Sequence, residues 1–190
     1  MPAESPVAPD RLGTVLDEIT QVVARVSRPD ISRMAERLAG GRRVFAAGEG
    51  RSGLMAKAFA MRLMHLGVTV YAIGESTTPA VGAGDILVAI SGSGATEATV
   101  RTAAAGRRAG ASVLALTTDP TSALADVAED VLVLPAATKY RRPDEAHTIQ
   151  PLSSLFDQVT HIALDAICLE LAGHRKIDNE TARRTHSNTE

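Results

Sequence analysis

Apolar positions follow a helical period in the first part of the chain. Residues 10 to 26 carry apolar residues at Leu12, Val15, Leu16, Ile19, Val22, Val23 and Val26, a spacing near the ~3.6-residue period of an amphipathic helix. A second, shorter helix is expected over residues 30–38, because Gly40 and Gly41 follow it. The pattern therefore predicts two helices before the first strand.

After residue 41 the pattern changes to short apolar runs separated by longer amphipathic stretches. The runs "RVFAA", "VTVYAI", "ILVAIS", "SVLALT" and "DVLVLP" are typical of buried strands. Helices are expected between and after them, over residues 51–66, 96–109, 121–127 and 151–171, with a polar loop over residues 135–148. Short apolar strands that alternate with helices predict an α/β fold with a five-stranded parallel sheet covered on both faces.

The length of 190 residues fits one compact domain. We expect residues 1–40 to be a helical segment of that same domain, residues 41–173 to form the α/β part, and residues 174–190 to be a loosely held polar tail. The first ten residues lack a basic start and an apolar stretch, so we do not expect a signal peptide there.

Charge and cysteine content narrow the classes of function. The net charge is −2 with no block of like charges, which argues against nucleic-acid binding. No apolar run approaches the ~20 residues of a membrane span. Cys168 is the single cysteine, which excludes an internal disulfide and favours a cytoplasmic location; its apolar surroundings favour a packing role.

Candidate chemistry lies in the loops that follow strands, where parallel sheets bind ligands. The third strand ends in "ISGSGATEATV", which places hydroxyls and glycines directly before a helix. Bare amides, a helix start and several hydroxyls can hold a phosphate monoester without a lysine or a metal. Capping of the helix is the alternative explanation. The predicted phosphate-binding residues are Ser52 in the first loop and Ser91, Gly92, Ser93, Gly94, Ala95 and Thr96.

The loop after the first strand carries a competing hypothesis. Gly48, Gly50 and Gly53 have the spacing of a dinucleotide-binding turn, and Glu75 lies about where a ribose-binding acid would follow. A dinucleotide fold has no need of the serine-rich turn after its third strand. The sequence therefore favours a phosphorylated small molecule over a dinucleotide.

Several segments resemble a known family. "SGSGATE" resembles the signature of sugar isomerase (SIS) domains, and residues 50–67, "GESTTPAVGAGDILVAISGSGATE" and "TIQPLSSLFDQ" resemble 6-phospho-3-hexuloisomerases; "RTHSNTE" does so weakly. The resemblance covers residues 44–171. It implies a flavodoxin-like three-layer αβα sandwich and a homotetramer with shared active sites. The implied reaction interconverts D-arabino-3-hexulose 6-phosphate and D-fructose 6-phosphate in formaldehyde fixation by the ribulose monophosphate pathway, without metal or other cofactor.

The implied reaction passes through a cis-enediol and needs a base near the substrate chain. Asp157 is the candidate base; it stands where the family has a glutamate, and the alternative is a surface or capping role. His65 and His186 also match family histidines and are candidate proton carriers. His65 lies far along its helix from Ser52, which favours a role in a neighbouring subunit's site, although a structural role at a helix end is equally open.

Further polar residues have less defined roles. Glu75 is a candidate contact for substrate hydroxyls or holds the turn that follows it. Lys139 is a candidate contact for substrate oxygens. Arg51 either reaches the phosphate or pairs with a carboxylate such as Glu49. Asp165 is expected to be paired structurally. A non-catalytic sugar-phosphate sensor and an isomerase of another phosphosugar remain alternative hypotheses.

Overall fold

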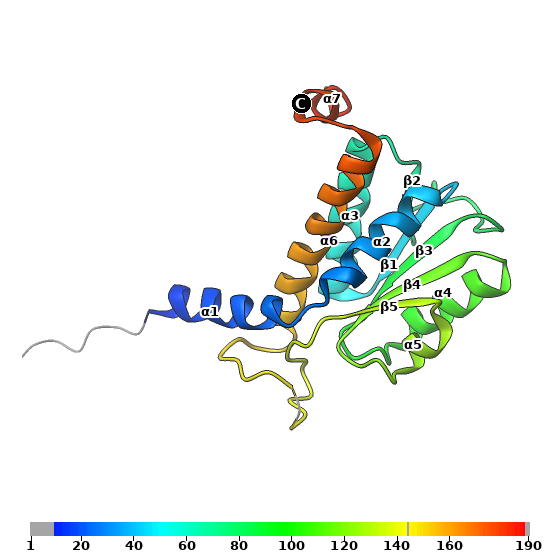
Figure 1. The fold of residues 1–190 in the computed structure, drawn as a ribbon. Helices are drawn as coiled ribbons and strands as arrows, with labels where there is room; N and C mark the ends of the chain where they lie inside the picture. The colour runs from blue at the N-terminus through cyan, green and yellow to red at the C-terminus, as the bar shows by residue number, and fades with distance from the viewer. Residues whose placement is uncertain (1–9, 144, 189–190) are drawn as a thin grey trace, which may run out of the picture.

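The computed structural model describes residues 10–143 and 145–188, and its centre is a parallel sheet of five strands in the order β2-β1-β3-β4-β5 (Figure 1). Residues Val44–Gly48 of β1 pair with Ile86–Ile90 of β3 along their whole length. The remaining strands are β2 (Val70–Ala72), β4 (Ser112–Thr117) and β5 (Asp130–Val133). The predicted α/β class with a five-stranded parallel sheet is confirmed.

Helices cover both faces of the sheet, which gives three layers (Figure 1). One face carries α2 (Arg28–Gly40), α3 (Gly50–His65) and α6 (Ser154–Arg175), and α1 (Arg11–Ala24) packs against α6. The opposite face carries α4 (Glu97–Arg108) and α5 (Ala123–Val127). A short helix, α7 (Asn179–Arg184), follows α6.

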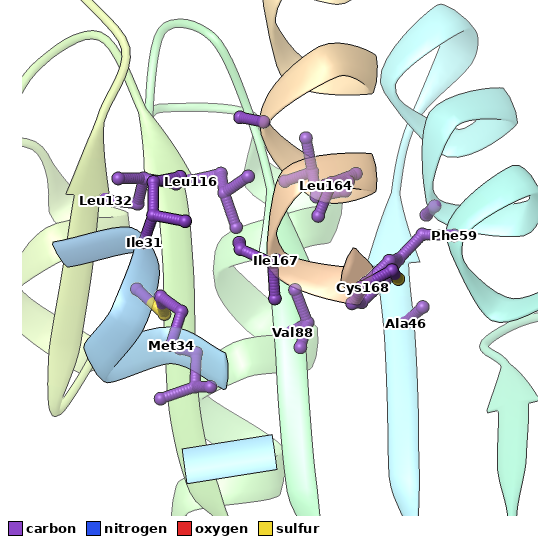
Figure 2. Close-up of a cluster of buried hydrophobic side chains, with 14 of the residues drawn as sticks. Ile31, Met34, Ala46, Phe59, Val88, Leu116, Leu132, Leu164, Ile167 and Cys168 are labelled. Carbon is purple, nitrogen blue, oxygen red and sulfur yellow. The ribbon is translucent and has the colours of Figure 1, made fainter. Parts of the chain in front are cut away.

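The larger core lies between the sheet and the layer of α2, α3 and α6 (Figure 2). Met34 of α2, Phe59 of α3 and Ile167 of α6 are each buried there. They face alternate strand residues such as Val88, whose neighbours in sequence face the smaller core under α4 and α5. Full burial of each such side chain contributes roughly 1.5–3 kcal/mol. Cys168 lies in this core as a free thiol, which agrees with the packing role expected for it.

Helix boundaries differ from the predicted ones where capping decides them. The helix expected over 30–38 begins at Arg28, because the Ser27 side chain accepts a hydrogen bond from the Asp30 amide and Pro29 fits the first turn. The helix expected over 151–171 begins at Ser154 and continues until Lys176 adopts a left-handed conformation.

The tail is more ordered than expected. Instead of a loosely held segment from residue 174, the chain completes α6 and then forms α7, whose start is capped by Asp178 through the Thr181 amide. Residues 1–9 and 189–190 lie outside the described residues, so what was expected of them is not addressed by the structure. Among the helices described, none combines the length and apolarity needed to cross a membrane.

Candidate active site

A cavity of about 300 Å³ opens at the carboxyl ends of β1 and β3. These neighbouring strands flank the point where the strand order reverses, since β1 connects outward to β2 and β3 connects outward to β4. Such a switch point is where open parallel sheets bind ligands. The lining residues come from three places: the turn after β1, the turn after β3, and the loop from β5 together with the first turn of α6.

The turn after β3 contributes Ser91, Gly92, Ser93 and Thr96 to this cavity, while Gly94 and Ala95 complete the turn without lining it. The Ser91 hydroxyl donates to the Thr96 hydroxyl at 3.0 Å. Thr96 precedes α4 but makes no side-chain cap hydrogen bond. Helix capping therefore does not account for this hydroxyl, and the first amides of α4 lie beside it without intrahelical acceptors.

Gly94 has a positive φ of 62°, and a Cβ there would lie 2.0 Å from the Ser122 hydroxyl oxygen. Glycine is thus required to turn the chain from β3 into α4. In the turn after β1, a Cβ on Gly53 would lie 2.7 Å from the Gly48 carbonyl oxygen, because the start of α3 crosses the end of β1 closely. The close approach of α3 to β1 therefore accounts for a glycine at position 53 without a bound dinucleotide.

Asp157, in the first turn of α6, faces this cavity with a side chain that is 4% exposed. The Arg51 Nε atom lies 3.0 Å from its Oδ2 atom, and the Ser52 hydroxyl donates to its Oδ1 atom at 3.2 Å. Burial raises the pKa of Asp157 above its ordinary value, and Arg51 and Ser52 offset part of that rise. The alternative of an exposed aspartate is excluded, and the carboxylate has the raised basicity that suits a general base.

Arg51 pairs with Asp157 rather than with Glu49, so the carboxylate pairing considered for it is the arrangement found. Arg51 remains largely exposed, at 59% of its side chain, and lines the cavity. Lys139, in the loop after β5, is the second cationic side chain that lines the cavity. Its backbone amide donates to the Ser153 hydroxyl at 3.2 Å, which ties the loop to the start of α6.

His65 and His186 lie together but away from this cavity. Their rings stack with centroids 5.2 Å apart, and the Thr185 hydroxyl donates to the His65 carbonyl oxygen at 3.0 Å. They line a separate hollow of about 440 Å³ between α3, α6 and α7. His65 is 13 residues beyond Ser52 on α3, a distance of roughly 20 Å along a helix. Burial, His186 and Arg62 together lower the pKa of His65.

Glu75 also lies outside the cavity. Its carboxylate is 2.5 Å from the Lys57 Nζ atom, and that ion pair lowers the pKa of Glu75. Asp165 is paired with Arg62 at 3.4 Å, as expected of a structural carboxylate. The structure thus brings Arg51, Ser52, the serine-rich turn and Asp157 together within one chain, and does not bring His65, His186 or Glu75 to them.

Sequence reasoning missed part of the lining. Thr138, Tyr140, Leu152 and Ser153 reach the cavity from the polar loop between β5 and α6. The quoted segment "TIQPLSSLFDQ" contains the last two, but no periodicity marks a loop residue as a wall of a cavity. Within the described residues, no group of three His, Cys, Asp or Glu side chains is placed to hold a metal ion.

The fold and this hydroxyl-lined cavity are those of a class of α/β domains that bind phosphorylated ligands where the strand order of a parallel sheet reverses. The family model described as SIS domain matches residues 37–163. The chain is 39% identical to the 3-hexulose-6-phosphate isomerase of Mycobacterium gastri, over 95% of this chain and 90% of that protein. It is 37% identical to the Bacillus subtilis protein of the same name, over 93% and 95%.

A solved structure from Methanococcus jannaschii, whose inferred function is that of a 3-hexulose-6-phosphate isomerase, superimposes with a TM-score of 0.83 and 25% identity, over 96% of this chain and 100% of that one. The chain therefore belongs to the SIS domain family and, within it, to the family of 3-hexulose-6-phosphate isomerases.

Proposed function

We propose that this protein interconverts D-arabino-3-hexulose 6-phosphate and D-fructose 6-phosphate through a cis-enediol. The observation that carries the proposal is the buried Asp157 carboxylate in the same cavity as the hydroxyl-rich turn. Family membership supplies the substrate class. The phosphate binds among Ser52, Ser91, Ser93 and Thr96, which fixes the distance from the sugar chain to the base.

The reaction needs one proton removed from C2 and one delivered to C3. In the direction of fructose 6-phosphate, the Asp157 carboxylate takes the C2 proton and returns it to C3, while the proton of the C2 hydroxyl moves to the oxygen on C3. Lys139, which lines the cavity, is the proposed donor to the developing oxyanion. Proton transfer of this kind requires no redox cofactor.

Phosphate binding also activates the base. Arg51 and Ser52 are engaged by Asp157 in the free protein. A phosphate dianion competes for both donors, and its own charge disfavours ionised Asp157. Asp157 then becomes more basic when a substrate is present, and a sugar without a phosphate leaves the carboxylate paired.

Assembly completes the proposal. Leu12 and Leu16 on α1 and Leu169 on α6 are 72%, 55% and 75% exposed, which favours burial against further copies of the chain. We place the protein in the cytoplasm as a homotetramer of the ribulose monophosphate pathway.

His65 and His186 act on substrate in an assembly that presents them to another chain's cavity. Mixed Asp157→Asn and His65→Gln tetramers then regain activity that neither variant has alone.

The test of the activity is a coupled assay. Hexulose 6-phosphate is supplied, and glucose 6-phosphate is measured after added phosphoglucose isomerase converts the fructose 6-phosphate formed. Turnover that depends on this protein is expected. Tight binding of the sugar phosphate without turnover at high protein concentration would instead identify a non-catalytic sensor, and turnover of another phosphosugar would identify a different isomerase.

A further inference from the structure

One wall of the cavity is made by the loop from β5 to α6, whose described residues form neither helix nor strand. Thr138, Lys139 and Tyr140 line the cavity from its first part, and Leu152 and Ser153 from its last part. Lys139 and Tyr140 are exposed on this loop. Its buried apolar residues, Leu134, Ala136 and Ala137, lie at its start, whereas Tyr140, Ile149 and Leu152 are exposed. The part that follows Ala137 therefore depends largely on polar contacts for its conformation.

The N-terminal helix α1 and the residue that caps its end, Arg25, hold this loop at both ends. Near the start of the loop, the Arg25 guanidinium donates to the Pro135 carbonyl oxygen at 2.8 Å. Near its end, the Glu18 carboxylate accepts three hydrogen bonds, from the Thr148 hydroxyl at 2.6 Å, the Ile149 amide at 2.7 Å and the Gln150 side-chain amide at 3.0 Å.

The Glu18 contacts are buried and charged. Glu18 is 9% exposed and Gln150 is 7% exposed. Burial raises the pKa of Glu18, but the three donors and the Arg141 guanidinium lower it by more, so it lies below its ordinary value. The carboxylate is therefore ionised at neutral pH, and hydrogen bonds to an ionised group are about twice as strong as neutral ones.

From Gln150 the contacts continue to the cavity wall. The Arg141 guanidinium donates to the Gln150 carbonyl oxygen and, at 2.8 Å, to the Thr138 carbonyl oxygen. The next residue, Lys139, donates its amide to Ser153. Glu18 is thus joined to two parts of the wall through one continuous set of hydrogen bonds, although it does not line the cavity itself.

We propose that Glu18 is a positioning residue, which fixes the β5–α6 loop so that Lys139 and Ser153 face bound sugar phosphate. The inference rests on the proposed function for its substrate. The alternative is that Glu18 simply attaches α1 to the domain, in which case its loss lowers stability and leaves the cavity unchanged.

The test compares Glu18→Gln with Asp17→Asn. Glu18→Gln keeps the size of the side chain but turns an amide N–H toward the donors of Thr148 and Gln150. Asp17 is the adjacent acid on α1 and is exposed, and its side chain makes no hydrogen bond or ion pair within the described residues, so Asp17→Asn is the matched control. The measurements are kcat and KM for hexulose 6-phosphate, the thermal unfolding midpoint, and hydrogen exchange of the Lys139 and Gln150 amides.

Glu18→Gln is expected to raise KM about tenfold, the effect of one lost charged hydrogen bond, with a smaller change in kcat and faster exchange at Lys139. Asp17→Asn changes none of these. A lower unfolding midpoint with unchanged KM and unchanged exchange at Lys139 would overturn the inference.

Two further arms keep the inference falsifiable. If Glu18→Gln does not fold, Thr148→Val removes one of the three hydrogen bonds from the loop side and should raise KM in the same direction but less; an unchanged KM overturns the inference. If the wild-type protein has no turnover, the proposed function fails, and the role of Glu18 is then judged from hydrogen exchange of the Lys139 amide. Faster exchange in Glu18→Gln than in Asp17→Asn supports the positioning role. Equal exchange in the two variants contradicts it.

Discussion

Asp85 and Asp157 are two buried aspartates at opposite ends of the same pair of strands. Asp85 precedes β3 at the amino end of the sheet, and Asp157 lies at the carboxyl end of β1 and β3. Their side chains are 0% and 4% exposed. Yet the pKa of Asp85 is lowered to about 2, whereas the pKa of Asp157 is raised.

The partners explain the opposite shifts. Asp85 accepts two hydrogen bonds from Arg43, at 2.9 and 2.6 Å, and one from the Gly82 amide at 2.8 Å, which together outweigh burial. Asp157 has one bond from the mostly exposed Arg51 and one from Ser52, which do not. A fully satisfied carboxylate stabilises the fold, and a partly satisfied one is available for chemistry.

Asp157→Asn has the largest expected effect on activity. Loss of the base should lower kcat by about 10³-fold, within the range for general-base catalysis, with little loss of stability. The coupled assay and thermal unfolding measure both. Asp157→Glu, which restores the residue type of the resembling family, should keep measurable turnover. The comparison of the two aspartates fails if Asp85→Asn lowers kcat as much as Asp157→Asn does.

The phosphate anchor gives the next largest effect. Ser91→Ala combined with Ser93→Ala removes two hydroxyls that line the cavity. Because hydrogen bonds to a charged group contribute about 1.5–3 kcal/mol each, KM should rise about 100-fold or more. Thr99→Val, at a buried hydroxyl of α4 without a recorded partner, is the control and should leave KM unchanged. If the double serine variant and Thr99→Val had the same KM, the proposal that the phosphate binds at this turn would be contradicted.

The sequence predicted the carboxyl end of the sheet, where Asp157 lies, better than the amino end, where Asp85 lies. Strands and helices followed from apolar periodicity, and the rule that ligands bind at the carboxyl ends of parallel strands brought Ser52 and Ser91 together correctly. Asp157 entered through resemblance. Asp85 carried no signal, because an aspartate before a strand is equally compatible with an exposed turn.

Positions that depend on loops and on the tail were beyond sequence reasoning. The pairing of His65 with His186 requires the chain after α7 to return to the end of α3, and a polar tail without apolar period does not predict that path. Glu18 likewise looked like an ordinary polar position on an amphipathic helix. Its three donors lie about 130 residues further along the chain, and no local pattern specifies so distant a contact.

The pH dependence of the free energy of unfolding tests the stabilising role of Asp85. Its pKa is about 2 in the folded protein against an ordinary value of 3.8, so its ionised form stabilises the fold by about 2 kcal/mol. Because the folded pKa is the lower one, this contribution is complete above about pH 4 and is lost as pH falls through 2. Asp85→Asn should remove it, which urea unfolding at pH 7 and pH 3 measures. A loss of equal size at both values would contradict the assignment.

The smallest expected effect concerns the acid limb of the pH profile. Burial raises the pKa of Asp157, and Arg51 is the first of the groups that hold it down. Since the base must be ionised, kcat/KM should rise with pH through this pKa. Arg51→Gln removes the cation, so the pKa rises further and the acid limb moves to higher pH. The substrate phosphate titrates as well, with a second pKa of about 6, but identically in both proteins, so their difference reports Asp157. Superimposable acid limbs would mean that Arg51 does not tune the Asp157 carboxylate, and the contrast between the two aspartates would then rest on the hydrogen bonds that Arg43 and Gly82 donate to Asp85.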